Sequence, residues 1–326
     1  MSWLLSGEVQ LAAGPEAGGV FGWFDADPAS RFVYPETTGY YLTFLSFLRA
    51  QKWPAGDFGS RARRAAAWIA RWSADAAPPA RVYLAGPQTH DWRNRLAFSF
   101  DLGMIWRGLA MARQPCSTIE RLLARFPVAG AGFLAAMPIQ SGPVAQSWSA
   151  QPGAFQLKLA AALLHSGVPA DPALRQAAEA VFAQYRHWDP PDCRRDLLHP
   201  YLYAVEGALL TRDHRLLRQA ASWIAKLAPH VDGSRSDVLA QLLRSACLLD
   251  AAGYLPHREW SARLPELAEA LCGYCAPDGR MYFRRDSLGR LEHVNVWSGM
   301  FAAQALMWFS QWRASALGIE AAAWLV

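Results

Sequence analysis

A histidine and a tyrosine lie one helical turn apart within residues 198–206. His199 and Tyr203 are four residues apart and Glu206 follows three residues later, so on a helix the three side chains share one face. A neighbouring histidine and tyrosine can take up and return a proton next to a carboxylate group. We therefore predict that His199 and Tyr203 are catalytic and that Glu206, deeper in the segment, is structural. The alternative for the whole group is a buried polar network that supports the fold.

Three further carboxylates stand where helices are expected to begin, at Glu36, Asp101 and Asp237. A carboxylate in a first helical turn interacts favourably with free backbone N–H groups, which is its structural explanation. It could instead project into a site. Hydrolysis of a glycosidic bond needs two carboxyl groups across a cleft, and the predicted pair is Glu36 or Asp101 with Asp237. Separations of about 5–5.5 Å or about 6.5–9.5 Å would distinguish retaining from inverting enzymes.

Aromatic, amide and cationic side chains gather close to these positions in the sequence. Aromatic rings and amides suit stacking on a sugar and hydrogen bonding to it, and arginine binds carboxylates. Turn chemistry, a solvated loop or core packing is the alternative explanation at each position. The predicted substrate-binding residues are Trp92, Arg93, Asn94, Trp148, Gln156, Arg235, Asn295 and Trp297, among which Arg93 with Asn94 or Asn295 would neutralise the carboxylate of a uronic acid.

Two kinds of helix alternate along the chain and would have to position these residues. One kind is apolar around most of its circumference and rich in small and aromatic residues, which is typical of buried helices. The other kind is amphipathic and belongs at the outside. Buried helices are predicted near residues 37–50, 99–112, 153–165, 199–210, 236–250 and 295–312, and amphipathic ones near 58–74, 116–127, 172–187, 213–228 and 260–273, with a short run near 319–325.

This alternation predicts an all-α fold, an (α/α)6 toroid of about six inner and six outer helices, with an open solenoid as the alternative. The linkers that lead into the inner helices are long, and long loops on one rim are where such a scaffold places function. Short rim strands are expected near residues 81–84 and 280–284. No stretch resembles an interdomain linker, so residues 1–326 are predicted to form one domain.

Composition and motifs narrow the functional classes. The chain has 326 residues, of which 52% are hydrophobic and 18% charged, with a net charge of +5. No long basic run or nucleic-acid motif occurs, so no nucleic acid is expected as a partner. The glycine-rich phosphate and dinucleotide loops, the H-E-x-x-H motif and the G-x-S-x-G motif are all missing from the sequence. No cofactor or metal is therefore expected.

The cysteines and the first residues bear on location. No secretory signal or long apolar span is recognisable, so a cytoplasmic protein without a transmembrane segment is expected. Five scattered cysteines fit reduced thiols. Cys272 and Cys275 have the spacing of a redox motif but end a helical run, so a redox role for them stays open.

Four short motifs resemble the repeated inner-helix signatures of α/α-toroid proteins. They are Tyr34-Pro-Glu-Thr-Thr-Gly-Tyr40, Phe100-Asp-Leu-Gly-Met104, His199-Pro-Tyr-Leu-Tyr-Ala-Val-Glu-Gly207 and Val294-Asn-Val-Trp297. This broad group holds six-hairpin glycosidases, toroidal polysaccharide lyases, sugar epimerases and squalene-cyclase-like proteins. The first two motifs are similar to stretches in bacterial toroid proteins associated with polysaccharide metabolism. The resemblance covers most of the chain as scattered motifs and implies the fold more specifically than the reaction.

The resemblance implies a carbohydrate-active protein of bacterial polysaccharide metabolism, acting on a glycan that could be acidic by lyase, epimerase or hydrolase chemistry. Its partners would be an oligo- or polysaccharide substrate and proteins of polysaccharide biosynthesis. One alternative is a noncatalytic toroid that binds a glycan or a partner. Another is a terpenoid-cyclase-like protein, although the Asp-x-Asp-Asp motif of hopene-type cyclases is missing and Asp25-Ala-Asp-Pro28 echoes it only in part.

Overall fold

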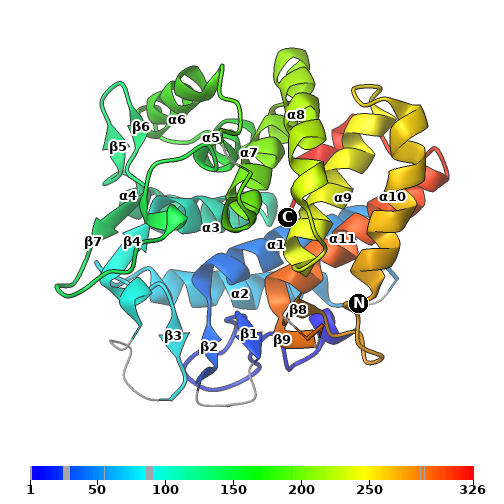
Figure 1. The fold of residues 1–326 in the computed structure, drawn as a ribbon. Helices are drawn as coiled ribbons and strands as arrows, with labels where there is room; N and C mark the ends of the chain where they lie inside the picture. The colour runs from blue at the N-terminus through cyan, green and yellow to red at the C-terminus, as the bar shows by residue number, and fades with distance from the viewer. Residues whose placement is uncertain are drawn as a thin grey trace.

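The computed structural model describes residues 2–24, 30–54, 56–85, 91–191, 193–286, 288–289 and 291–326. The partial acidic motif at residues 25–28 lies outside the described residues. The rest of the chain forms mainly helices, with short strands between them (Figure 1).

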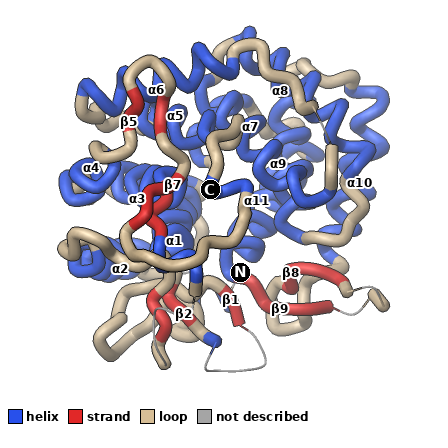
Figure 2. The backbone as a smooth tube through the Cα atoms, turned by 60° about the vertical axis from the view of Figure 1, so that its left-hand side comes forward, coloured by secondary structure: helices blue, strands red, loops and turns tan. Residues whose placement is uncertain are grey.

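Six helices form a closed inner ring. They are α1 (Pro35–Ala50), α3 (Ser99–Met111), α5 (Gln156–His165), α7 (Leu198–Thr211), α9 (Ser236–Ala251) and α11 (Val296–Arg313). Each contacts the next along the series, and α11 contacts α1, which closes the ring. Seen from a second direction, the helices surround the point where the chain ends (Figure 2). The predicted α/α-toroid fold is confirmed, and it is a closed ring instead of an open solenoid.

Five amphipathic helices cover the ring from outside. They are α2 (Phe58–Trp72), α4 (Ser117–Leu123), α6 (Pro172–Tyr185), α8 (His214–Leu227) and α10 (His257–Cys272), and each packs on the inner helix that precedes it. Helix α8 shows why such segments form. The Asp213 side chain accepts hydrogen bonds from the backbone N–H groups of Arg215 and Leu216 at its start, and Trp223 and Ile224 are buried on its inner face.

The last run of the chain differs from the expected sixth outer helix. Residues Ile319–Trp324 form a 3-10 helix, η8, which contacts the inner helices α1, α7 and α9. Buried polar side chains of the ring hold this segment by its backbone. The Arg107 guanidinium donates to the carbonyls of Ala323 and Leu325, and Gln304 donates to the carbonyl of Trp324. These bonds draw the segment into the ring instead of onto its outer surface.

A buried ion network lies beside the same segment. Lys158 Nζ lies 2.7 Å from Glu206 Oε2, and Arg244 Nε lies 2.9 Å from Glu206 Oε1, with all three side chains fully buried. Both cations also donate to the carbonyl of Val326. Burial opposes the ionisation of Glu206, but the charges of Arg244 and Lys158 outweigh it and lower its pKa. Glu206 thus joins α5, α7 and α9.

Glycines let the inner helices cross closely. A Cβ atom on Gly39 would lie 2.6 Å from the Cα atom of Ile105, and one on Gly108 would lie 2.2 Å from the carbonyl oxygen of Gly39. The helices α1 and α3 therefore touch backbone to backbone, at a distance that no larger residue allows. This explains the small residues in the inner segments of the sequence.

The short strands lie where loops enter the ring. The strand order β1-β9-β8 forms one antiparallel sheet from Trp23–Phe24, Leu291–Asn295 and Tyr282–Arg285. Antiparallel pairs join β2 (Phe32–Val33) to β3 (Val82–Tyr83), β4 (Leu96–Phe98) to β7 (Ala136–Pro138), and β5 (Pro127–Val128) to β6 (Gly132–Phe133). Strands β2, β4 and β9 each run almost directly into an inner helix. They fix the direction in which the first turns of α1, α3 and α11 enter the ring. Short 3-10 helices occur at Trp3–Leu5 (η1), Trp92–Arg95 (η4), Trp148–Ala150 (η5), Arg195–Leu197 (η6) and Ala228–His230 (η7).

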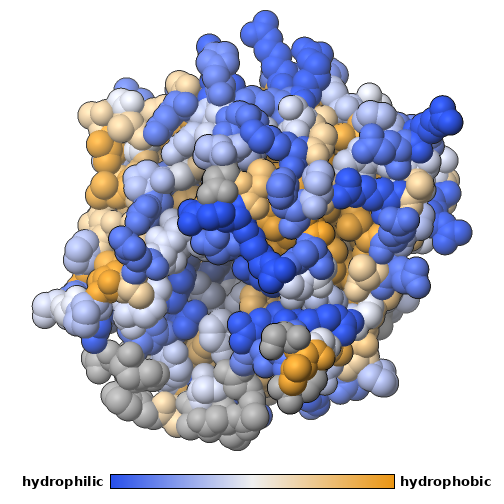
Figure 3. All heavy atoms as spheres, viewed as in Figure 1, coloured by the Kyte–Doolittle hydropathy of each residue, from blue (hydrophilic) through white to orange (hydrophobic). Residues whose placement is uncertain are grey.

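One large buried hydrophobic cluster runs through the ring and its outer layer, from Trp3 to Val326. Five tryptophans of the core are fully buried, namely Trp68, Trp106, Trp223, Trp260 and Trp308. The face shown in Figure 3 is mostly hydrophilic. Within the described ranges, no helix combines the length and the apolar character that a membrane crossing requires.

Candidate functional site

A cavity of about 170 Å³ opens where the inner helices begin. Its wall is built by the first two turns of α1, α3, α7 and α11 and by the loops before them. We call it the central cavity and define it by Glu36, Asp101, His199, Tyr203, Arg93 and Trp297, which all line it. Most of the predicted site residues on inner-helix starts are thus brought to one place.

Two carboxyl groups from different helices share this cavity. Glu36 stands in the first turn of α1 and keeps partial exposure, while Asp101 stands in the first turn of α3 and is 8% exposed. The hydroxyl of Tyr34 donates to Asp101 Oδ2 at 3.3 Å. Burial, followed by the charge of Glu36, raises the pKa of Asp101 to about 8. Burial also raises the pKa of Glu36, against hydrogen bonding from Tyr34 and the charge of Arg93.

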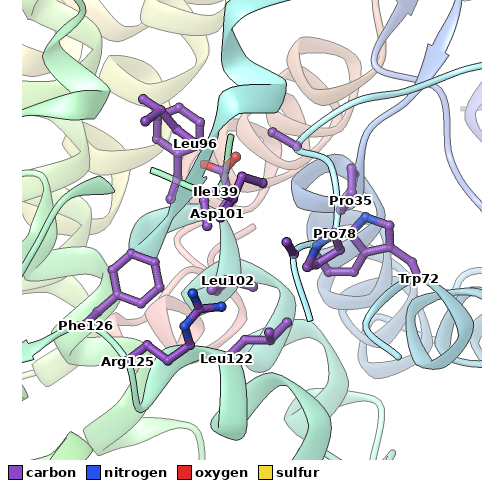
Figure 4. Close-up of a pocket in the computed structure, with 14 residues that line it drawn as sticks. Pro35, Trp72, Pro78, Leu96, Asp101, Leu102, Leu122, Arg125, Phe126 and Ile139 are labelled. Carbon is purple, nitrogen blue, oxygen red and sulfur yellow. The ribbon is translucent and has the colours of Figure 1, made fainter. Parts of the chain in front are cut away.

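The surroundings of Asp101 explain why it resists ionisation. Asp101 also borders an apolar pocket whose walls include Leu96, Leu102 and Phe126, and its carboxyl group lies near Leu96 and Ile139 (Figure 4). A carboxylate loses its hydration there, and this loss outweighs the charge of Arg93 and the hydrogen bond from Tyr34. Burial raises the pKa of both carboxyl groups and the charge of Arg93 lowers both, so it is the charge of Glu36, which raises the pKa of Asp101 further, that favours keeping the proton on Asp101. Two carboxyl groups whose pKa values are pushed apart form an acid and its partner base.

His199 faces the two carboxyl groups from α7 with its tautomer fixed. Its Nδ1 atom lies 2.7 Å from Gln241 Oε1 and 3.2 Å from Asp237 Oδ2. Because both neighbours are oxygen acceptors, Nδ1 carries the hydrogen and Nε2 carries the lone pair. Burial lowers the pKa of His199 to about 4, although the charge of Asp237 opposes this. The imidazole is neutral at neutral pH and can accept a proton at Nε2.

Asp237 does not join the carboxyl pair, which corrects the predicted pairing of Glu36 or Asp101 with Asp237. It is fully buried and is not among the residues that line the central cavity. Arg235 Nε and Nη2 bind its two oxygens at 3.0 and 2.6 Å, and the backbone N–H of Val238 binds Oδ1. Burial opposes ionisation, but Arg235 and His199 outweigh it and lower the pKa of Asp237. Its role is to hold Arg235 and His199 in place.

Two tyrosines form the floor between the carboxyl pair and the histidine. The hydroxyl of Tyr40 donates to the hydroxyl of Tyr203 at 2.9 Å. Lys158 Nζ lies 4.6 Å from the centre of the Tyr203 ring, on the side of the buried ion network. Burial raises the pKa of Tyr203 well above its ordinary value. Tyr203 is therefore a neutral phenol that can donate a proton.

Arginines and tryptophans form the mouth of the cavity. Arg93 donates to the hydroxyl of Tyr34 at 3.2 Å, and Arg81 pairs with Asp91 at 2.8 Å. The Nε atoms of Arg81 and Arg93 are buried and have no hydrogen-bond partner among the described residues. Arg81 and Arg93 both line the cavity. The predicted residues Trp148, Arg235 and Trp297 also line the cavity.

Four predicted binding residues lie outside the lining of the cavity. The amide of Asn94 bonds with the backbone N–H and carbonyl of Arg81, at 2.7 and 2.8 Å. Gln156 donates to the carbonyl of Phe133, and Asn295 caps α11 by accepting from the N–H of Ser298. Trp92 packs edge-to-face on Phe98 in a small separate cluster. The three buried amides share one cause, since they satisfy loop or helix backbone that would otherwise lack partners.

Sequence reasoning did not single out Arg81, Tyr34, Tyr40 and Trp23, although all four line the cavity. Tyr34 and Tyr40 flank Glu36 within one motif, which was an available signal. Arg81 and Trp23 lie on short rim segments, and only the folded loops bring them to the mouth.

No cluster of three or more potential metal ligands occurs among the His, Cys, Asp and Glu residues of the described ranges. Cys272 and Cys275 are exposed free thiols at the end of α10.

Comparison with known proteins supports the fold. No protein-family model and no curated protein matches the sequence. Among solved structures, a sugar epimerase from a ruminal bacterium matches with a TM-score of 0.65 and 11% identity, over 93% of this chain and 94% of that one. An unsaturated glucuronyl hydrolase specific for heparin matches with a TM-score of 0.63 and 11% identity, over 91% and 92%. A type II terpene cyclase from Scytonema matches with a TM-score of 0.59 and 15% identity, over 97% and 96%. At these identities the similarity establishes an α/α-toroid fold that sugar-processing enzymes and a terpene cyclase share.

Proposed function

We propose that this protein is a carbohydrate-active enzyme that hydrolyses a glycosidic bond in the central cavity. Asp101 acts as the proton donor and Glu36 as its ionised partner. The observation that supports this is the pair itself, in which burial and then the charge of Glu36 raise the pKa of Asp101 to about 8. An acid that keeps its proton at neutral pH beside an ionised carboxylate is what glycoside hydrolysis requires.

The reaction follows from the two carboxyl groups. Asp101 gives its proton to the bridging oxygen as the bond between that oxygen and the anomeric carbon breaks. Glu36 either takes a proton from the water that attacks the anomeric carbon or bonds to that carbon itself. In the second route water then attacks the same carbon, gives its proton to the ionised Asp101 and displaces Glu36. In the first route Glu36 ends protonated and passes its proton back to Asp101 through solvent.

The mouth of the cavity favours an anionic or hydroxyl-rich substrate over a terpenoid. Arg81, Arg93 and Arg235 line it together with three tryptophans. A terpenoid cyclase needs a dry aromatic chamber, in which three cations would be costly to desolvate. Because Arg81 and Arg93 line the cavity and arginine binds carboxylates, a uronic acid is the favoured unit.

A second function is supported by one separate observation, the fixed neutral tautomer of His199. A base at Nε2 beside the neutral phenol of Tyr203 could remove a proton from a carbon next to a carboxylate and return one, as in a lyase or an epimerase. In this reaction His199 takes the proton from carbon, and Tyr203 donates its own to the leaving oxygen or to the opposite face.

Product analysis of purified variants separates these functions. The protein is incubated with acidic and neutral polysaccharides, and the products are assayed for new reducing ends, for the ultraviolet absorbance of an unsaturated sugar, and for epimers by chromatography. We expect new reducing ends, and a fall of about 10²–10⁴-fold in Asp101→Asn and Glu36→Gln. The matched control is Asp278→Asn, because Asp278 is exposed on a rim turn.

Each outcome has a definite meaning. If both carboxyl variants keep full activity, hydrolysis by this pair is wrong. If the product is unsaturated or epimerised and His199→Ala and Tyr203→Phe abolish it, the second function replaces the first. If the protein binds a glycan without turning it over, the site is a binding site only.

A further inference from the structure

A second and larger cavity, of about 650 Å³, lies beside the central cavity. Its lining includes five aromatic side chains, and also the polar residues Gln146, Ser147 and Gln151. We call it the aromatic groove and define it by Trp148, Phe155, Tyr185, Trp188 and Tyr201. None of its residues apart from Trp148 takes part in the site described above.

The groove and the central cavity share a wall. Trp148 lines both, and its ring lies 5.1 Å from the Phe155 ring and 5.9 Å from the His199 ring. The first turn of α7 completes the wall, with His199 on the cavity side and Tyr201 on the groove side. Side chains two positions apart on a helix point in nearly opposite directions, about 200° apart. The two cavities are therefore separated at this point only by the side chain of Trp148 and the first turn of α7.

The aromatic side chains of the groove are held in place before any ligand arrives. The carbonyl of Trp188 accepts hydrogen bonds from Gln219 Nε2 and Trp223 Nε1, both at 3.0 Å. Its ring packs edge-to-face on the rings of Trp223 and Tyr201, at 4.9 and 5.2 Å. Trp148, Tyr185, Trp188 and Tyr201 are all half-buried and keep part of their surface open. Fixed aromatic surface with polar groups beside it lowers the entropy lost on binding.

Size and chemistry together indicate the occupant. The groove, at about 650 Å³, is several times larger than the central cavity of about 170 Å³. Sugar rings present apolar C–H faces that pack on aromatic rings and hydroxyl groups that bond to amides and hydroxyls at the edge. The rim alternates in charge, with Arg194 and Asp196, so it selects neither sign strongly.

We propose that the aromatic groove binds the sugar units that adjoin the unit held in the central cavity, so that the substrate is a chain of several sugars and not a free sugar. This proposal rests on the proposed carbohydrate function, but it concerns binding and can be tested without turnover. On this proposal, the bond that reacts joins the sugar unit in the central cavity to the next unit, on the side of Trp148.

The test is the dependence of affinity on chain length. The Asp101→Asn protein, which retains the groove, is titrated by calorimetry with two ladders from monosaccharide to hexasaccharide, cello-oligosaccharides and oligogalacturonates. We expect the affinity for one ladder to rise about tenfold or more from the monosaccharide to the longer chains. In the same background, Trp188→Leu and Tyr185→Ala should remove most of that rise and leave the affinity for the monosaccharide unchanged.

The matched control is Phe182→Ala, because Phe182 is a half-buried aromatic residue on the same helix as Tyr185 and does not line the groove. It should keep the full rise, and thermal unfolding verifies that all variants are folded. The proposal is overturned if affinity does not depend on chain length, or if the rise in affinity persists in both groove variants. It is also overturned if neither ladder binds. If affinity rises with chain length but the wild-type protein turns over no more substrate than Asp101→Asn does, the proposed binding in the groove stands and the proposed hydrolase activity is refuted.

Discussion

Replacing Asp101 by asparagine should stabilise the folded protein while it removes the proposed proton donor. The ordinary pKa of this carboxyl group is 3.8, and in the folded protein burial raises it to about 8. Between these two pH values the unfolded chain ionises Asp101 while the folded chain keeps the proton, so the free energy of unfolding falls as the pH rises. The slope is about 1.4 kcal/mol for each pH unit.

The magnitude follows from the width of that window. At about pH 7 the wild-type protein loses about 4 kcal/mol of stability relative to pH 4, because ionisation of Asp101 in the unfolded chain is favoured. Asparagine is neutral and of similar shape, and its side-chain oxygen can still accept the hydrogen bond that Tyr34 donates to Asp101. The variant therefore does not lose the stability that ionisation of Asp101 in the unfolded chain costs the wild-type protein.

Urea unfolding at about pH 4.5 and about pH 7.5 measures the effect, with the exposed Asp278→Asn as control. Asp101→Asn should be more stable than wild type by a few kcal/mol at the higher pH, and the difference should shrink at the lower pH. A difference that is the same at both pH values would refute the reasoning. A variant that is less stable than wild type at the higher pH would also refute it, because Asp101 would then be ionised in the folded protein and could not donate a proton.

Three other predictions concern the ring and its histidine. Glu206→Gln removes the carboxylate that pairs with the buried side chains of Lys158 and Arg244 and should cost about 3–5 kcal/mol in chemical unfolding, whereas a loss under about 1 kcal/mol would show that the ion network matters little. Gly39→Ala places a Cβ atom 2.6 Å from the Cα atom of Ile105 and should cost about 1–3 kcal/mol, while Gly7→Ala, with nothing within 4 Å, should change the melting temperature little. Burial lowers the pKa of His199 from 6.5 to about 4, so acidification through this window favours the unfolded chain. His199→Gln should therefore abolish up to about 3 kcal/mol of that acid-induced loss in a pH series of urea unfolding, and an unchanged acid response would contradict the neutral imidazole.

The predicted helices could be placed because their signals are local. The observed α7 and α9, at Leu198–Thr211 and Ser236–Ala251, lie within one or two residues of the ranges predicted from apolar composition. The run near residues 319–325 was placed outside the ring because it is short and only partly apolar. Its position depends on hydrogen bonds to residues far away in the chain, such as Arg107, and a local sequence pattern cannot predict such bonds.

The candidate site likewise has features that the local sequence determines and features that only the tertiary structure determines. The sequence by itself determined that polar and acidic side chains such as Glu36, Asp101 and His199 stand at the starts of buried helices. Local residues are sufficient for this, because the pattern of apolar residues indicates a buried helix and the capping residues indicate where it begins. Only the tertiary structure decided that Glu36 pairs with Asp101, while Asp237 supports His199. The reason is that closure of the ring sets which helix starts face each other, and the surrounding side chains set how far each carboxyl group is removed from water.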